Sequence, residues 1–445
     1  MEKEELKRRC IEVIEKRKEE IISLGEKIYR TPELGYKEFE TTKCMEEAFA
    51  SLGLETVSPI AYTGCKAGAG GRKGPTVAVM GELDSVVCPE HKDCAANGNM
   101  HACGHHVQLA NLYGCAAGLA ESGVLDELCG TVEFIAIPAE ECVDLDYRDK
   151  LIEDGKIQFY GGKQEYLLRG GMDDVDMVLQ CHMMEVEGGR KCCTVDTVTN
   201  GFMSKSVKFI GRSAHAGIAP HEGINALNMA QLALNNINAL RETFREEDKV
   251  RVSAIITSGG DLVNVVPSVV TMQVMVRAAS VDAMEDAGRK VGRALKAGAL
   301  AVGGKVEIHD RIGYLPLSTD STLSGLYREN MLAYGGADED SFVEHYETAG
   351  STDLGDMCQL LPCMHVWASG ISGGLHSKDF KIEDYERAYV LPAKMLALTV
   401  IDLLYGDADK AKEIMEAYRP KFTKETYIKY MKDHSVVELF DGSAI

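Results

Sequence analysis

Residues 131–141 read TVEFIAIPAEE. The apolar run from Thr131 to Pro138 is typical of a strand that is buried on both faces, and such strands form parallel sheets covered by helices. Helical stretches such as Val107–Gly118 separate this run from similar ones at Thr76–Met80, Met177–Cys181 and Met364–Ala368. The pattern predicts an α/β fold with a layered α/β/α domain and a mostly parallel sheet.

The middle of the chain follows a different pattern, which predicts strand, helix, strand, strand, helix and strand. These elements are expected at Lys205–Ile210, Gly223–Thr243, Val250–Thr257, Val269–Arg277, Val281–Val302 and Lys305–His309. The βαββαβ order is the ferredoxin-like arrangement, a small sheet with two helices on one face. We therefore expect an inserted domain at 200–313, between the two parts of the first domain at 1–199 and 314–445.

Charge and hydropathy exclude several classes of partner. The chain has 48 Lys and Arg against 69 Asp and Glu, a net charge of −21, which disfavours nucleic acids and anionic membranes as partners. Residues 1–20 lack the apolar core of a signal peptide. The most apolar stretch, Ala388–Tyr405, contains Pro392 and two charged residues and is expected to form a buried helix. We expect a cytoplasmic protein whose 14 cysteines are reduced thiols.

Polar residues capable of chemistry follow the ends of the predicted strands. Because the carboxyl ends of parallel strands meet at one edge of a sheet, these residues are expected to lie close together. They occur in the segments Gly81–Asp84, Met100–His106, Pro138–Glu141, Cys181-His182 and Gly373–Ser377.

The residue types in these segments favour a metal centre over separate structural roles. A Cys-x-His pair, adjacent glutamates and two strand-end histidines offer thiolate, imidazole and carboxylate ligands. A divalent metal supplies both requirements of amide hydrolysis, a nucleophilic water and an electrophile on the carbonyl oxygen. Glu140 and Glu141 are expected to point to opposite sides, so one can bind metal while the other exchanges protons with water.

The motifs resemble those of metallopeptidase family 20, specifically subfamily D. That branch includes the aminoacylase-like hippurate, indole-acetyl-amino-acid and p-aminobenzoyl-glutamate hydrolases. The resemblance extends over residues 25–400, and the matching segments are His101-Ala102-Cys103-Gly104-His105, Pro138–Glu141, Leu375-His376-Ser377 and Gly211–Ala216. It implies a zinc-peptidase-like catalytic domain and, at 200–313, a lid and dimerisation domain.

The resemblance also implies roles for individual residues. Two divalent ions would be held by Cys103, His105, Glu141, His182 and His376, with Cys103 as the bridge. Zn²⁺ is the default for such ligands, with Mn²⁺, Co²⁺ or Ni²⁺ as alternatives. Glu140 would be the general base and acid, and Asp84 would orient a ligating imidazole.

Three residues of the inserted domain are expected to act on the substrate. The resemblance implies that His215 enters the site from the partner subunit and stabilises the oxyanion, which makes a homodimer necessary for activity. Asn264 and Arg277 match positions that hold a substrate carboxylate, and an Arg fork is suited to that group.

This sequence departs from the pattern of the branch at several points. His106 replaces the usual acid or amide, Gln108 replaces a frequent His, and Glu82 stands where Asp is usual. The segment Val143–Gly171 is longer than expected and is predicted to lie near the site entrance, where it could reshape the acyl pocket. These departures bear on which substrate is bound, not on the type of reaction that is expected.

We therefore expect a dinuclear metal-dependent amidohydrolase that cleaves N-acyl or N-aroyl amino acids, or a dipeptide, and releases a free amino acid. One alternative is a non-catalytic metal-dependent binding protein. Another is a thiol hydrolase with Cys103 as nucleophile and His105 as base, although this role leaves the other clustered residues without a function.

Overall fold

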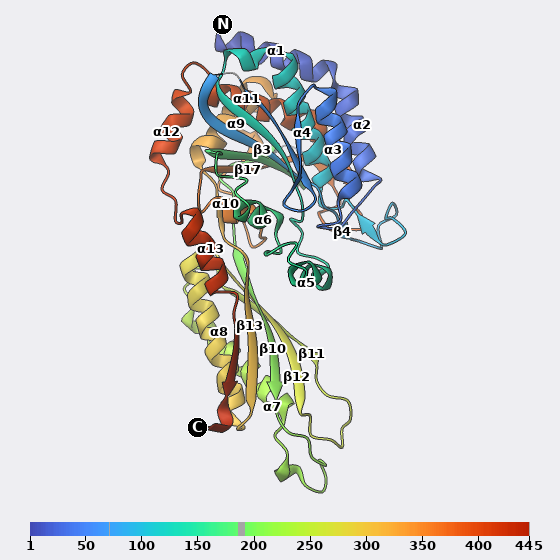
Figure 1. Ribbon diagram of the computed structural model, residues 1–445, viewed down its shortest axis with the longest axis vertical. Helices are drawn as coiled ribbons and strands as arrows, with labels where there is room; N and C mark the ends of the chain where they lie inside the picture. Colours follow the sequence, from blue (N-terminus) through green and yellow to red (C-terminus); the bar gives the residue numbers. More distant parts are fainter. Residues whose placement is uncertain (71, 186–191, 445) are drawn as a thin grey trace. The chain divides into compact units, whose positions relative to one another are not determined.

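The computed structural model describes residues 1–70, 72–185 and 192–444 (Figure 1). The chain forms two compact units, which are described separately. The first comprises Met1–Val198, Ser318–Glu347 and Asp356–Lys421, and the second comprises Thr199–Leu317, Thr348–Gly355 and Phe422–Ile445. Short elements lie where the chain passes from one unit to the other: β9 (Val198–Thr199), β14 (Leu317–Ser318), β16 (Glu347–Thr348) and α10 (Leu354–Met357).

The first unit contains a large sheet with the strand order β1-β2-β6-β3-β7-β17-β8-β15, and β18 pairs with β17. Its four central strands are parallel. They are β6 (Cys129–Ile137), β3 (Arg72–Glu82), β7 (Met177–Glu185) and β17 (Cys363–Ser372). The outer strands are β1 (Thr56–Ile60), β2 (Gly64–Gly70), β8 (Cys193–Thr194), β15 (Phe342–Val343) and β18 (Lys381–Ile382). Each of the four predicted buried strands is part of one central strand, which confirms the predicted mostly parallel sheet.

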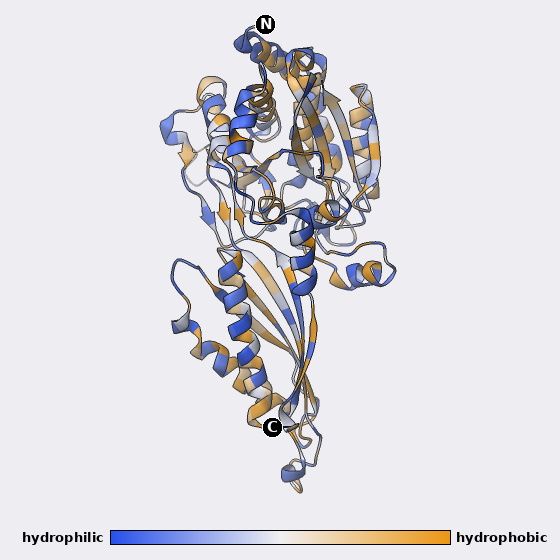
Figure 2. Cartoon of the chain, turned by 60° about the vertical axis from the view of Figure 1, so that its left-hand side comes forward, coloured by the Kyte–Doolittle hydropathy of each residue, from blue (hydrophilic) through white to orange (hydrophobic). Residues whose placement is uncertain are grey.

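Helices cover this sheet in layers. α4 (His105–Glu121) and α11 (Leu391–Leu404) pack on β3, β6 and β7, and α1 (Lys3–Lys16) and α2 (Lys18–Tyr29) pack on α4. Figure 2 shows hydrophobic residues along the strands and hydrophilic stretches on the helices around them. None of the helices in the described part of the chain is long and apolar enough to span a membrane.

The remaining helical segments of the first unit are short or peripheral. A π-helix (Glu386–Val390) precedes α11, and the stretch 388–405 is buried as predicted. A two-residue hairpin ladder joins β4 (Val86–Val87) and β5 (Asn99–Met100). The other helices are α3 (Phe39–Ser51), α5 (Leu145–Glu153), α6 (Gly162–Leu168), α9 (Ser321–Tyr334) and α12 (Asp409–Ala417), with short 3₁₀ turns at Val124–Glu127 and Glu339–Ser341.

The second unit contains an antiparallel sheet with the order β11-β12-β10-β13-β19. Alternate side chains of β12 are buried, among them Val270, Met272 and Val274, because the helices cover one face of the sheet. The observed βαββαβ order matches the prediction. The elements are β10 (Gly201–Ile210), α7 (Ala226–Ala239), β11 (Arg251–Ser258), β12 (Val269–Ala278), α8 (Val281–Ala301) and β13 (Lys305–Tyr314), with 3₁₀ turns at Pro220–Glu222 and Arg241–Thr243.

The C-terminal residues differ from the expected arrangement. We expected 314–445 to return wholly to the catalytic domain, but α13 (Lys424–Asp433) and β19 (Val437–Asp441) belong to the second unit. β19 pairs antiparallel with β13, and a 3₁₀ segment at Gly442–Ala444 follows it directly. Only five residues long, β19 has no distinctive periodicity, so its pairing depends on a neighbouring strand edge that the sequence does not reveal.

Candidate metal centre

The predicted polar segments meet at the carboxyl edge of the central strands. Glu82 ends β3, His182 lies near the end of β7, and Glu140 and Glu141 follow β6. Cys103 and His105 flank Gly104, whose left-handed φ of 87° allows the chain to turn into α4. The loop after β17 is held to the same edge because the backbone N–H of His376 donates to the carbonyl of Ala102 (2.8 Å).

Two sets of possible metal ligands share one thiol. The atoms of Cys103, His105 and His182 lie within 4.8 Å of one another, and so do those of Cys103, Glu141 and His376. Cys103 Sγ is 3.5 Å from His182 Nε2, and Glu141 Oε1 is 2.8 Å from His376 Nε2. A single sulfur common to both sets is suited, once deprotonated, to bridging a pair of divalent ions. The structure thus brings all five predicted ligands together.

Asp84 fixes the orientation of His105. The Nδ1 atom of His105 lies 2.8 Å from the Asp84 carbonyl oxygen and 3.2 Å from its carboxylate, so this nitrogen carries a proton. Nε2 of His105 is buried and makes no hydrogen bond to any described residue. A buried nitrogen without a hydrogen bond, on a ring fixed from its other side, fits a metal ligand.

Glu140 and Glu141 diverge, as adjacent residues in an extended segment are expected to. Glu141 contacts His376, whereas Glu140 Oε2 is 4.0 Å from His105 Nε2. Ala139 has a left-handed φ of 58°, and its backbone N–H donates to the buried carboxylate of Glu38 (2.8 Å). Both glutamates follow this turn, and their side chains reach different partners, so one can bind metal while the other transfers protons.

Burial and neighbouring charges shift the pKa values of the clustered groups. Burial raises the pKa of the Cys103 thiol well above its usual value, and Glu141 raises it further. Burial also lowers the pKa of His182 to about 4, so that its ring is neutral near pH 7. Burial alone would raise the pKa of Glu141, but the hydrogen bond and charge of His376, together with His105 and Cys103, lower it. Two ligands are thus ready to bind, and Cys103 must first lose a proton.

The predicted residues of the inserted domain form two separate groups. His215 pairs with Val265 in a short antiparallel bridge, which places it beside Asn264. His215 Nδ1 accepts hydrogen bonds from the N–H groups of Gly217 and Ile218 (3.2 and 3.1 Å), so its neutral ring carries the proton on Nε2. Arg277, near the other end of β12, donates to Ser351 Oγ (2.8 Å) and the Ala349 carbonyl. Each residue of a strand adds about 3.3 Å, so the length of β12 keeps Arg277 apart from the loop that contains Asn264 in the same chain.

Supporting residues around the centre were not identified from sequence. Arg148 is buried in the segment 143–171 and donates to the carbonyl oxygens of Tyr160 (2.6 Å) and Glu141. Trp367, the only tryptophan, pairs across strands with His182, and their ring centroids are 4.4 Å apart. Through Arg148, the segment 143–171 supports the loop that carries Glu141, in addition to any part it plays at the site entrance.

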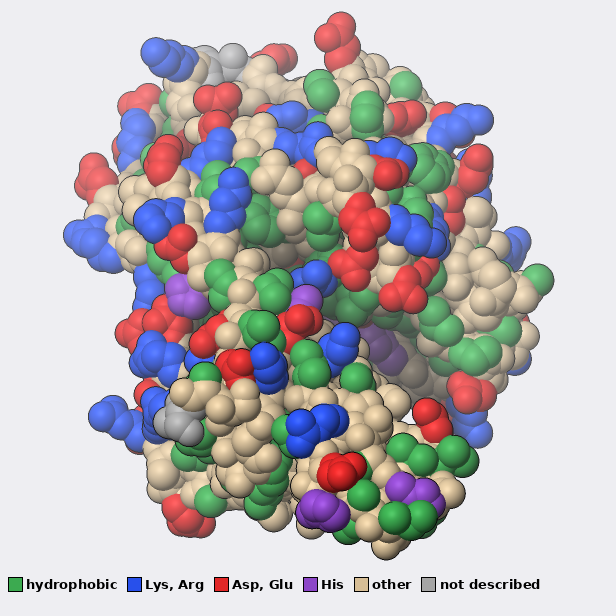
Figure 3. Space-filling model, turned by 60° about the horizontal axis from the view of Figure 1, so that its bottom comes forward, with side chains coloured by type: hydrophobic (Ala, Val, Ile, Leu, Met, Phe, Trp, Pro, Cys, Tyr) green, Lys and Arg blue, Asp and Glu red, His purple; other side chains and the backbone are tan. Residues whose placement is uncertain are grey.

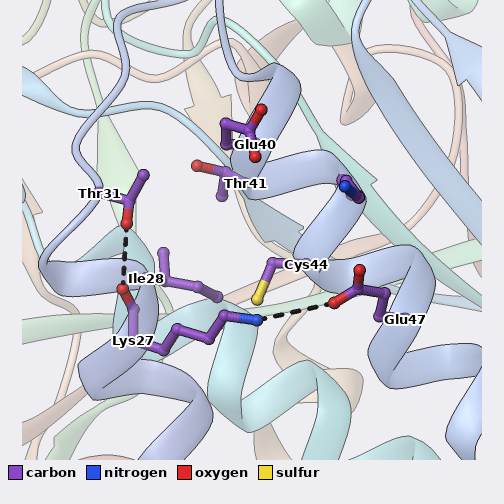
Figure 4. Close-up of a pocket in the computed structure, with 8 residues that line it drawn as sticks. Lys27, Ile28, Thr31, Glu40, Thr41, Cys44 and Glu47 are labelled. Atoms are coloured by element: carbon purple, nitrogen blue, oxygen red, sulfur yellow. Dashed lines mark hydrogen bonds and ion pairs between the residues drawn. The ribbon is translucent and has the colours of Figure 1, made fainter.

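A separate pocket lies beside α2 and α3 (Figure 4). Lys27, Cys44 and Glu47 are among its lining residues, and Lys27 Nζ is 3.7 Å from Glu47 Oε2. None of the three groups of possible metal ligands found in the described residues includes a residue of this pocket.

The fold and this site define a metallohydrolase of a known family. Residues 78–402 match the model of peptidase family M20/M25/M40, and the chain belongs to this family. It is therefore a hydrolase of the M20 peptidase and amidohydrolase type.

Particular relatives differ in the substrate that their names state. The chain is 29% identical over 448 residues to the Xaa-Arg dipeptidase of Mus musculus, covering 95% of this chain and 93% of the relative. It is 27% identical over 328 residues to the N-acetyl-L-cysteine deacetylase of Bacillus subtilis, covering 70% and 71%. A dinuclear metal-binding M20 peptidase of Bacillus subtilis superposes with a TM-score of 0.69 at 21% identity, covering 88% of this chain and 99% of the other.

Proposed function

We propose that this protein is a dinuclear metal-dependent amidohydrolase that cleaves N-acyl or N-aroyl amino acids, or a dipeptide, to a free amino acid. The observation that supports it most is the pair of ligand sets sharing Cys103, with Glu140 beside them. The two relatives above are named for a dipeptide and an N-acyl amino acid, which span the same substrate range.

In this proposal Cys103 would be shared by two ions, His105 and His182 would complete one ligand set, and Glu141 and His376 would complete the other. Zn²⁺ suits a thiolate with imidazoles, and Mn²⁺, Co²⁺ or Ni²⁺ can occupy similar ligands. When bound, the ions would polarise the scissile carbonyl and make water acidic enough to attack at neutral pH.

The protein's own groups would carry out proton transfer and substrate positioning. Glu140 Oε2 takes the proton of the attacking water and passes it to the leaving amine. His215 donates from Nε2 to the developing oxyanion, and Arg277 holds the substrate carboxylate. Because Asn264 lies beside His215, the two enter the site together.

We further propose that residues 200–313 act as a lid and dimerisation domain, and that His215 is supplied by the partner subunit of a homodimer. β11 is an edge strand of its sheet, and apolar side chains are exposed on it and on the nearby loop, including Ile255 (61%) and Leu262 (64%). Figure 3 shows hydrophobic side chains and histidine together on the face turned forward. An exposed apolar edge is a surface that a second copy can cover.

The reaction is tested by measuring amino-acid release from a panel of substrates. The panel contains N-acetyl, N-benzoyl, N-indoleacetyl and p-aminobenzoyl amino acids together with dipeptides, and the enzyme is loaded with Zn²⁺ or Mn²⁺. Release that is absent with the Glu140→Gln protein would support the proposal and identify the acyl preference. Silence across the panel with metal bound would favour the non-catalytic binding protein instead.

Sharing of the site across the dimer predicts complementation. His215→Ala and Glu140→Gln homodimers should each be inactive, whereas a hybrid has one site with both groups intact. Random exchange makes half of the dimers hybrid, so an equal mixture should regain about one quarter of wild-type activity. A chain carrying both substitutions, mixed with either single variant, should not regain activity. Absence of recovery after exchange demonstrated by mass spectrometry would contradict a shared site.

Metal affinity should rise with pH. Because burial raises the pKa of Cys103, the thiol is protonated in the metal-free protein near pH 7, and binding must release that proton. Each released proton makes the affinity rise about tenfold per pH unit below that pKa. Competition titration with a chelator between about pH 6 and 8 measures this slope. A pH-independent affinity would contradict a thiolate ligand.

A further inference from the structure

Beside the two ligand sets lies a third carboxylate, Glu82, at the end of β3. Its Oε2 is 3.1 Å from Nε2 of His105, and Glu82, His105 and Glu140 form a further group whose possible ligand atoms lie within 4.8 Å of one another. The contact with His105 does not have hydrogen-bond geometry. Glu82 is therefore close enough to bind an ion held by His105, although it belongs to neither of the sets that share Cys103.

Three donors hold the Glu82 carboxylate. Lys163 Nζ and Gln180 Nε2 each donate to Oε1 at 2.6 Å, and Gln108 Nε2 donates to Oε2 at 2.6 Å. Gln180 also donates to the side-chain oxygen of Gln108 (3.2 Å). Glu82 and Gln108, two of the departures noted in the sequence, are thus in direct contact and form part of one network.

The segment 143–171 supplies the charged donor of this network. Lys163 is fully buried in α6, and the helix begins against the turn that carries Glu140. A Cβ at Gly162 would lie 1.7 Å from the Pro138 carbonyl oxygen, so only glycine permits this approach. This close contact positions the next residue, Lys163, so that its ammonium group reaches the carboxylate of Glu82.

Removing this cation would leave a buried carboxylate close to His105 Nε2, with only the neutral amides of Gln108 and Gln180 as donors. Such a charge is costly in the protein interior, and a nearby divalent ion is its strongest available partner. A further carboxylate ligand would fill a coordination position, whereas catalytic metal sites keep one position open for substrate and water.

We propose that Lys163 is a positioning residue that keeps Glu82 beside the metal centre and out of its coordination sphere. The proposal rests on the proposed metal-dependent function. It assigns to the segment 143–171 control of the coordination number, in addition to any effect on the acyl pocket.

Co²⁺ provides the test, because its visible absorption weakens as the coordination number rises. Lys163→Met should bind Co²⁺ at least about tenfold more tightly, with weaker absorption and a kcat about 100-fold lower, since Glu82 now ligates. Lys163→Met/Glu82→Gln, which carries no charge at either position, should regain the wild-type spectrum. Glu82→Gln alone should keep that spectrum, because Glu82 is not a ligand when Lys163 is present.

Each result discriminates between explanations. A wild-type spectrum and affinity in Lys163→Met would overturn the proposal, and so would a double variant that retains the weakened absorption. If Lys163→Met does not fold, an altered spectrum in Glu82→Gln would overturn it, and an unchanged spectrum in both Glu82→Gln and the folded double variant would support it. Failure of the wild-type protein to take up Co²⁺ would instead reject the metal centre itself.

Discussion

Glu140→Gln is expected to reduce kcat about 10²- to 10⁴-fold while both metal ions stay bound. The amide of Gln cannot accept a proton from water, but it has nearly the shape of the carboxylate. Glu140 Oε2 is 4.0 Å from His105 Nε2, and the residue is outside both ligand sets that share Cys103. Single-turnover kinetics together with metal analysis of the same preparation would measure the two properties.

The neighbouring residue provides the matched control. Glu141→Gln removes a carboxylate from the set with Cys103 and His376, so it should lose metal as well as activity. Glu153→Gln, on the exposed part of α5, should change neither. If Glu140→Gln lost metal while Glu141→Gln retained it, the two carboxylates would have exchanged roles.

Cys103→Ala should have the second large effect, because this thiol belongs to both ligand sets. Removing a shared ligand weakens the binding of both ions at once. We expect the metal affinity to fall by more than about 100-fold, because that is the upper range for the loss of a hydrogen bond that only supports a ligand. Activity should fall with metal content. Mass-spectrometric metal analysis after dialysis, and loss of the near-ultraviolet thiolate band of the Co²⁺ form, would detect this.

Another buried cysteine controls for nonspecific effects of removing a thiol. Cys115 is fully buried in α4 and is absent from all three ligand groups found in the described residues. Cys115→Ala should therefore keep two ions and the thiolate band, although the small cavity it creates lowers stability. Retention of two ions by Cys103→Ala would show that the sulfur does not bridge them.

The candidate ligands could be predicted because their segments follow strand ends or begin a helix. Apolar runs locate the buried strands, and parallel strands bring their carboxyl ends to one edge, so Glu141 and His182 are expected to converge. Cys103 precedes a predicted helix, and its ligand type and motif, not a strand end, indicate its place in the site. The pairing of β19 with β13 could not be predicted, since hydrogen bonds to a strand edge leave little trace in a five-residue sequence.

By itself, the sequence determined the α/β class and the βαββαβ insertion, because hydrophobic periodicity is a local property. It also predicted, through the family resemblance, a set of metal ligands, which stays a proposal. Only the tertiary structure revealed which groups support that set. Glu38 and Lys163 are far from their partners along the chain, and together with Arg148 they resemble ordinary charged surface positions in the sequence. Their burial and pairing depend on how α5 and α6 pack against the Pro138–Glu141 turn, and that packing involves contacts between distant segments.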